Sequence, residues 1–440
     1  MLVEPPKTVE FDKGLIAKWE HFFTKRYGCG PMLSRALGTF IVSSALYNAK
    51  VTDKMGAVVP SLWFFLITKT GTGKSPPLAT VRKVLRDYDG KLLGPARFTV
   101  EGLTAHITGK KTKADVDEPD DDVLPHTHLA IVRDEMSSLL EDRTKRTYLS
   151  GMDEFLSELW DGYLQGYRTR GHYSEGNVPV YITLFGAASH RFLRILDEAF
   201  FEQGIGNRPL WIDEKIEAPL ADRDFFLPDE SDAELEALTA ETHEAFKILS
   251  TLTYAVFGNA TGLRNWSNEI RRKLNEGGYS SDMEAGYMAK QVLNVIKLSI
   301  VYSASRFAII DNNILVMDED MKLAISDIGE YAKMWRSLVS KWQDRAFPPT
   351  ELRLPTRKID LSNVLAIAKK RVLFTHGNIK ADLDTSDGKG VAEVLGLGIN
   401  KGHWVEVPME DLSPEEVTRF KPRRGPFPQV FKITEDGMKI

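Results

Sequence analysis

The sequence predicts an α/β fold in which buried strands are joined to helices. Three observations carry this prediction: an unbroken apolar run at 62–67, a loop with two glycines after it, and a second apolar run at 129–132 that ends in two carboxylates. Short apolar runs bounded by turn residues are typical of buried strands, and a helical pattern follows the glycine loop. The chain is therefore expected to have a sheet core with helices packed on it.

The loop after the first strand has the composition of a phosphate-binding loop (P-loop). Its glycines let the backbone wrap around phosphates, Lys74 can reach the β- and γ-phosphates, and the Ser75 hydroxyl can bind Mg²⁺. Thr68 stands where the usual motif has its first glycine. The expected ligands are ATP and Mg²⁺, and the residues expected to hold ATP are Thr70, Gly71, Thr72, Gly73, Lys74, Ser75 and Pro76.

Two prolines follow this loop without excluding a helix. Pro76 and Pro77 fall in the first turn, where a missing N–H group loses no helical hydrogen bond. The alternative is a chance Gly-Lys-Ser sequence in a surface loop. The strand before the loop and the helix after it favour the phosphate-binding interpretation.

Composition excludes several classes of protein. The 440 residues are 42% hydrophobic and 27% charged, which is typical of a soluble chain of about two to three domains. A net charge of −5 restricts any nucleic-acid surface to a local patch. A single cysteine, Cys29, excludes a disulfide framework, and neither a signal peptide nor an apolar run of ~20 residues is present. We expect a cytoplasmic protein without membrane partners.

Changes of pattern along the chain predict five segments. Apolar residues at helical spacing indicate helices at both ends of the sheet core, and a proline-rich stretch indicates a linker. The predicted segments are an N-terminal helical region at 1–57, a P-loop ATPase core at 58–230, a helical lid at 231–346, a linker at 347–358 and a winged-helix-like domain at 359–440.

The winged-helix-like domain is predicted because the last segment has helices followed by short strands. Residues 353–424 hold 13 lysines and arginines against 10 acidic residues, a net charge of +3. So small a positive charge is compatible with DNA or with a protein partner. A dense charged stretch at 109–127 is expected to be a flexible insertion in the core.

The second strand ends in Asp134 and Glu135, which are candidates for the chemistry of ATP hydrolysis. Asp134 is expected to hold Mg²⁺ and its water shell, and Glu135 is expected to polarise the attacking water. The alternative is a solvated acidic pair at a strand end. The P-loop upstream favours the catalytic interpretation, because a glutamate after the aspartate suits hydrolysis.

A hairpin at 167–181 is the candidate DNA-binding element. Arg168, Arg170 and His172 alternate on one face with aromatic residues opposite, a pattern that suits a phosphate backbone. A solvated basic edge strand is an equally good interpretation.

Two further residues are candidates for catalysis. Ser189 follows an apolar strand at 180–185 and is placed to contact the γ-phosphate or the attacking water. Arg208 follows two glycines and could supply the positive charge that stabilises phosphoryl transfer, in its own subunit or in a neighbouring one. A structural ion pair is the alternative for Arg208.

Taken together, these motifs resemble the primase-associated P-loop ATPases of phages, plasmids and integrated elements, which are similar to replicative helicases. The resemblance covers about residues 35–310. Its more specific part is the order and spacing of the motifs, which are the P-loop, Phe98-Thr99-Val100-Glu101-Gly102-Leu103, the Asp134-Glu135 strand, Trp160-Asp161-Gly162 and Gly204-Ile-Gly-Asn207-Arg208-Pro-Leu-Trp211.

The resemblance implies a RecA-like or AAA+ core that works as a homo-oligomeric ring, with a hexamer expected. One subunit would supply Lys74, Ser75, Asp134, Glu135 and Ser189, the next would supply Arg208, and the 167–181 hairpin would touch DNA near the pore. The implied function is that of an ATP-dependent DNA helicase or translocase in the replication of a phage or mobile element, with any primase on a separate protein. The alternatives are a replication initiator or scaffold that binds DNA without unwinding it, and a DNA-packaging motor.

Overall fold

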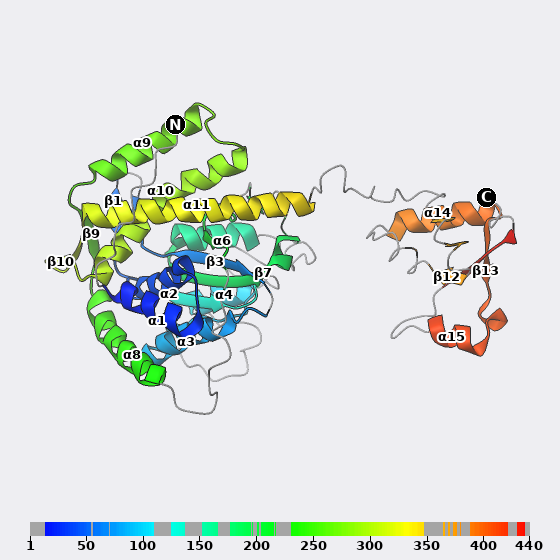
Figure 1. The fold of residues 1–440 in the computed structure, drawn as a ribbon, viewed down its shortest axis with the longest axis horizontal. Helices are drawn as coiled ribbons and strands as arrows, with labels where there is room; N and C mark the ends of the chain where they lie inside the picture. The colour runs from blue at the N-terminus through cyan, green and yellow to red at the C-terminus, as the bar shows by residue number, and fades with distance from the viewer. Residues whose placement is uncertain are drawn as a thin grey trace. The chain divides into compact units, whose positions relative to one another are not determined.

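The structure is a computed structural model of the chain (Figure 1). It divides into two compact units, Met1–Gln343 and Asp344–Ile440. The first unit contains the predicted segments 1–57 and 58–230 and nearly all of 231–346. The predicted linker lies outside the described residues. Those residues are 14–53, 56–69, 71–109, 125–136, 152–165, 177–194, 196, 200–201, 204–214, 216, 230–346, 364–365, 368–369, 373–375, 379, 388–420 and 429–435.

A parallel sheet of four strands forms the centre of the first unit. Its order is β4-β7-β3-β8, so that β7 lies between the strand before the glycine loop and the strand that ends in two carboxylates. All four strands are almost completely buried, as expected for parallel strands covered on both faces. Their bounds are β3 Trp63–Thr68, β4 His128–Arg133, β7 Tyr181–Ser189 and β8 Leu210–Ile212.

Alternate residues of the strands feed two hydrophobic cores, one on each face of the sheet. Phe64 and Leu66 face the core that includes α1, α2, α3 and α8, whereas Trp63 and Phe65 face the core that includes α4 and α6. The helices are α1 Leu15–Tyr27, α2 Pro31–Ser44, α3 Ser75–Tyr88, α4 Val100–Thr108, α6 Met152–Asp161 and α8 Glu230–Leu249, and a 3₁₀ helix, η3, covers His190–Arg194.

Two long helices contribute to both cores. α10 (Asp282–Ser305) is capped by Ser281, whose side chain accepts a hydrogen bond from Glu284 N–H, and α11 (Asp318–Ala346) runs along the first unit (Figure 1). Tyr287 of α10 stacks on Trp335 of α11 with 4.5 Å between ring centroids. The shorter α9 (Thr261–Asn275) buries few residues and packs against α10.

Short strands interrupt two regions that the sequence predicts as wholly helical. β1 (Val51–Asp53) pairs with β2 (Gly56–Val58), and β9 (Tyr254–Phe257) pairs with β11 (Asn313–Val316), which also pairs with β10 (Ile309–Ile310). The helical expectation is wrong there because β9 and β11 are far apart in the chain, and strands this short are stabilised only by pairing.

The second unit has a three-stranded antiparallel sheet in the order β12-β14-β13. Helix α14 precedes the short strands β13 and β14, in agreement with the helices and short strands predicted for this segment. The described elements are β12 Leu373–Thr375, α14 Gly388–Asn400, β13 Trp404–Val407, η4 Met409–Asp411, α15 Pro414–Phe420 and β14 Val430–Ile433.

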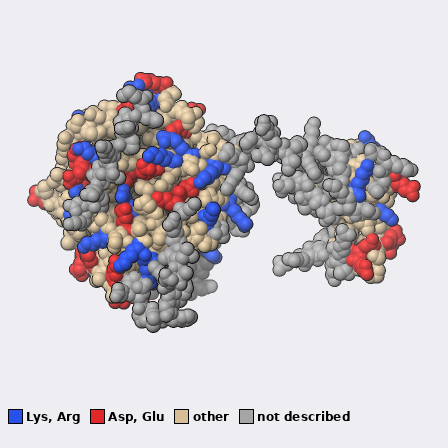
Figure 2. Space-filling view, in the orientation of Figure 1, with Lys and Arg blue, Asp and Glu red and all other residues tan. Residues whose placement is uncertain are grey.

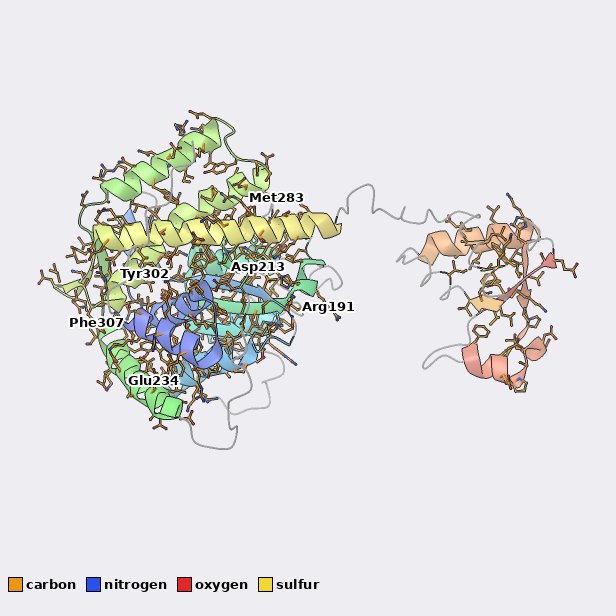
Figure 3. All side chains as sticks on the ribbon, viewed as in Figure 1. Arg191, Asp213, Glu234, Met283, Tyr302 and Phe307 are labelled. Carbon is orange, nitrogen blue, oxygen red and sulfur yellow. The ribbon has the colours of Figure 1, made fainter. Side chains whose placement is uncertain are left out.

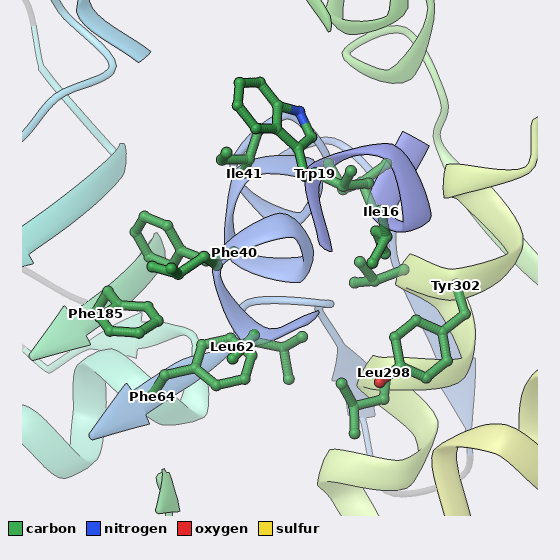
Figure 4. Packing of buried hydrophobic residues seen from close by; sticks show 14 of the residues in the cluster. Ile16, Trp19, Phe40, Ile41, Leu62, Phe64, Phe185, Leu298 and Tyr302 are labelled. Carbon is green, nitrogen blue, oxygen red and sulfur yellow. The ribbon is translucent and has the colours of Figure 1, made fainter. Parts of the chain in front are cut away.

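Aromatic packing fixes α2 on the sheet (Figure 4). Phe185 of β7 contacts Phe40 of α2 edge-on and stacks on Phe64 of β3, with 5.7 Å between ring centroids in both pairs. All three side chains are fully buried. Phe185 therefore joins the middle strands of the sheet to the helix that covers them.

We expect Phe185→Ala to lower the free energy of unfolding of the first unit by about 3–5 kcal/mol, because it leaves a cavity at this junction. Urea denaturation followed by tryptophan fluorescence measures the change. The control is Ile310→Ala, because Ile310 is 53% exposed and its loss is expected to change stability by no more than ~0.5 kcal/mol. Equal losses in the two variants would contradict the assigned core.

Candidate functional site

The carboxyl ends of the central strands bring the predicted catalytic residues to one edge of the sheet. Thr68, the last residue of β3, is directly opposite Ser189, the last residue of β7. Arg133, the last residue of β4, is opposite Gly186 on the other side of β7, so Asp134 and Glu135 emerge at the same edge. Ligands of open parallel sheets bind at this edge.

The glycine loop contains two residues in the left-handed backbone region. Gly71 and Gly73 have φ angles of 82° and 78°, which residues with a side chain rarely adopt. A Cβ added at either glycine would meet no heavy atom within 4 Å apart from those of its chain neighbours, so each would point into open space. Ser75 is the first residue of α3, and the positive end of the helix dipole points toward the loop. Thr70 lies outside the described residues.

Thr68 has a structural role at the position where the usual motif has a glycine. It is a buried strand residue, for which a β-branched side chain is suited. Its hydroxyl lies 3.2 Å from the hydroxyl of Thr72, which donates to the Lys69 carbonyl at 2.8 Å. These contacts close the base of the loop from the strand side.

Basic side chains pair with both carboxylates after β4. Lys74 Nζ lies 3.4 Å from Glu135 Oε2, and Arg82 Nη2 lies 3.3 Å from Asp134 Oδ1. About half of each carboxylate side chain is exposed, so both remain open to a ligand. Arg82 is on α3, two helical turns after Ser75, and so links the helix of the P-loop to the acidic strand end.

A buried arginine holds the backbone of the acidic segment. Arg133 donates from Nε to the Glu135 carbonyl and from Nη1 to the Ala96 carbonyl, both at 2.9 Å, and burial lowers the pKa of its guanidinium. Met136 donates its N–H to the Ala187 carbonyl and packs where a side chain at Gly186 would stand. The acidic segment is therefore attached to β7, next to Ser189.

A second polar group at the same edge was not predicted from the sequence. His190 Nε2 lies 3.3 Å from Asp213 Oδ1, and Lys341 of α11 pairs with the other oxygen of Asp213. Asp213 is labelled in Figure 3. Arg191, which is exposed, follows His190 directly. Residues this far apart in the chain give no sequence signal, because only the ends of β7 and β8 bring them to α11.

The donor set at this edge fits Mg²⁺ bound together with nucleotide phosphates. Mg²⁺ usually takes one or two protein oxygens and fills its remaining positions with phosphate and water. The Ser75 hydroxyl and the Asp134 carboxylate could supply such oxygens. Among the described residues no group of three or more His, Cys, Asp or Glu side chains is placed to hold a metal ion.

Arg208 does not join these residues within one chain. Leu210, the first residue of β8, is opposite Phe64, four residues before Thr68. At ~3.3 Å per residue, the start of β8 lies ~13 Å from the end of β3, and Arg208 precedes it at the amino ends of the strands. Its Nη2 donates to Asp161 Oδ2 at 3.0 Å, and the residue is only 8% exposed. The ion pair considered as its structural alternative is thus present.

A buried lysine lies beside that ion pair. Lys297 of α10 is 3% exposed, and its Nζ is 3.9 Å from the centre of the Trp160 ring and 3.3 Å from the Trp160 carbonyl. Burial, more than the neighbouring charges, lowers the pKa of Lys297 to about 7. The Arg208 guanidinium lies over the same ring at 5.4 Å.

The predicted DNA-binding hairpin is described only at its base. Tyr163 pairs with Pro179 and Leu164 with Val178, which makes β5 (Tyr163–Leu164) and β6 (Val178–Pro179) an antiparallel pair. Arg168, Arg170 and His172 lie outside the described residues. The expected insertion at 109–127 is described only at 109 and 125–127.

Comparison with protein-family models and with curated protein sequences finds no match for this chain. In the described part of the chain, no helix has the length and apolar character needed to cross a membrane.

We expect Gly73→Ala to weaken ATP binding by about tenfold, because a φ near +78° costs alanine roughly 1–2 kcal/mol. The added methyl group would meet no heavy atom within 4 Å, so the effect is conformational. The matched control is Gly90→Ala, which also adds a methyl group into open space but at ordinary φ. Titration with a fluorescent ATP analogue measures both, and equal affinities would contradict the assigned loop geometry.

The buried lysine predicts a pH dependence of stability. Between pH 7 and 10 the unfolded chain keeps the Lys297 proton and the folded chain loses it, so stability should rise by up to about 1.4 kcal/mol per pH unit. Lys297→Met should remove this rise, whereas Lys333→Met, at an exposed site on α11, should keep it. Urea denaturation at several pH values tests this, and parallel curves for both variants would refute it.

Proposed function

We propose that the chain is a P-loop ATPase that drives a DNA helicase or translocase of a phage or mobile-element replication system. The observation that carries the ATPase proposal is the convergence of Lys74, Ser75, Ser189 and the Asp134-Glu135 pair on one edge of the sheet. Chance sequence motifs would not be expected to meet there, because β3 and β4 are separated by about 60 residues and by the intervening strand β7.

The same geometry supports a role for each residue. ATP phosphates would bind the loop N–H groups and draw Lys74 away from Glu135, which leaves the Glu135 carboxylate free to orient and deprotonate water. Mg²⁺, held by Ser75 and Asp134, would neutralise charge on the phosphates. Ser189 is level with Thr68 at the base of the loop and would contact the γ-phosphate or the water.

An oligomeric ring is proposed because Arg208 lies at the edge opposite the P-loop of its own chain. A head-to-tail interface brings different surfaces of two copies together, and such interfaces form rings when the rotation between copies closes. In that arrangement Arg208 of one copy could serve the ATP of the next copy, once it is released from Asp161. The finer RecA-like or AAA+ assignment and the hexamer belong to this proposal, as does the cytoplasmic location.

The surface of the second unit is consistent with the alternative function of a replication initiator or scaffold. The strand order β12-β14-β13, with β13 and β14 after helix α14, supports a winged-helix-like domain. However, exposed carboxylates gather on its described surface (Figure 2), and they would repel a DNA backbone. These carboxylates belong to β13, η4 and α15 and are Glu406, Glu410, Asp411 and Glu415. A protein partner suits that surface better, so DNA contact is proposed for the 167–181 hairpin.

We expect Glu135→Gln to lower DNA-stimulated ATP hydrolysis by about 10²- to 10⁴-fold while leaving ATP and DNA binding intact, because only the general base is lost. Phosphate release and strand displacement on a forked duplex are the measurements. Glu244→Gln, at an exposed site on α8, is the control. Hydrolysis by wild-type protein without unwinding would reject the helicase and favour the scaffold or the packaging motor.

An ATP site formed by two neighbouring copies predicts complementation between two inactive variants. Lys74→Ala lacks a working P-loop, and Arg208→Ala lacks the cation offered to a neighbour, so a mixture should recover part of the ATPase activity. Size-exclusion chromatography with a non-hydrolysable ATP analogue should show an oligomer in parallel. A monomer under all conditions, or no recovery by an oligomeric mixture, would reject the role of Arg208 in trans.

A further inference from the structure

Positive charge exceeds negative charge in a half-buried cluster at the edge of the sheet opposite the P-loop. The cluster contains the side chains of Arg208, Lys290 and Lys297, and within the described part of the chain Asp161 is the one carboxylate that acts on all three. Among the described residues Lys290 has no ion pair, and Arg208 Nε is buried without a hydrogen-bond partner. Buried cations are costly unless they are paired.

We propose that Arg208, Lys290 and Lys297 form a binding site for a phosphate group, and that Asp161 is the occupant that a phosphate displaces. A phosphate carries up to two negative charges and several acceptor oxygens, whereas Asp161 makes one charge-assisted hydrogen bond here. The exchange would compensate cations that a single carboxylate leaves uncompensated. The site is separate from the P-loop and does not depend on the proposed function.

The protein holds the arginine segment in place for such a ligand. Asn294 of α10 donates to the Arg208 carbonyl at 2.9 Å, and Gln291 donates to the Asn207 carbonyl at 3.2 Å. A side chain at Gly204 would stand 2.5 Å from Arg208 Nη1, so this glycine makes room for the guanidinium. The backbone is thereby fixed, while the guanidinium Nε–H has no hydrogen-bond partner among the described residues.

A phosphate would reach the cluster from its partly exposed side. The Asp161 side chain is 29% exposed, and Lys290 is also half-buried. Burial and the nearby Arg208 lower the pKa of Lys290, which a bound anion would reverse. Asp161 ends α6, and Gly162 (φ 89°) leads directly into β5, at the base of the predicted hairpin. A ligand that displaces Asp161 would therefore act on the hairpin root.

The test uses the full chain with Lys74→Ala, which removes phosphate binding by the P-loop lysine. Inorganic phosphate is titrated at constant ionic strength and followed by calorimetry. Lys290→Gln should weaken binding about tenfold or more, and Asp161→Asn should tighten it, because the competing carboxylate is gone. Lys333→Gln, at an exposed site on α11, is the matched control. Circular dichroism verifies the fold of each variant.

Binding unchanged by Lys290→Gln, or weakened by Asp161→Asn, would overturn the proposal. Two further arms identify the source of the phosphate. If the phosphate belongs to a nucleic-acid backbone, Lys290→Gln should weaken binding of an oligothymidylate. If the phosphate belongs to ATP on a neighbouring copy, Lys290→Gln should lower the ATPase activity recovered by mixing Lys74→Ala with Arg208→Ala chains. A response in neither arm leaves free phosphate as the ligand.

The outcome is separable from that of the proposed function. Wild-type protein that fails to bind ATP would reject the ATPase while phosphate binding to the cluster stands. Conversely, normal ATP hydrolysis with no phosphate binding by the Lys74→Ala chain would reject only the cluster.

Discussion

The position of β7 between β3 and β4 is the constraint on which the rest of the first unit depends. It is buried on both faces, and its ladder hydrogen bonds set the level of both neighbours. That register places Ser189 beside the P-loop strand and Gly186 beside the acidic one. Gly186 then admits Met136, and the hydrogen bond from Met136 to Ala187 holds the acidic segment at the sheet edge.

The two edges of this sheet differ in the solvent exposure of their charged side chains. At the carboxyl edge the ion pairs of Lys74 and Arg82 with the two carboxylates are open to solvent, so a ligand can exchange them at low cost. At the amino edge Arg208 and Lys297 are buried around a tryptophan, where an unbalanced charge is expensive. The exposed ion pairs at the carboxyl edge fit the proposed exchange of a nucleotide. The buried cations at the amino edge fit the proposed replacement of their carboxylate partner by an anion.

Local patterns were enough for much of the candidate site. The apolar strand, the two glycines and the basic and hydroxyl residues after them predicted the loop conformation, because φ > 0 and a helix start are local properties. Arg82 and Arg133 were missed as partners of the acidic segment, since their contacts cross from α3 to β4 and from β4 to the chain near Ala96. The strands β9 to β11 were missed for the same reason.

The sequence by itself predicted the proposed chemistry, since the glycine loop and the acidic pair follow apolar strands whatever the topology. It also determined that Thr68 replaces a glycine, although only the pairing with Ser189 and the hydroxyl contact with Thr72 explain why a β-branched residue fits there. The tertiary structure alone decided which edge each residue occupies. Strand order and register are long-range properties, and they put Arg208 at the far edge of its own chain, beside Asp161 and Lys297.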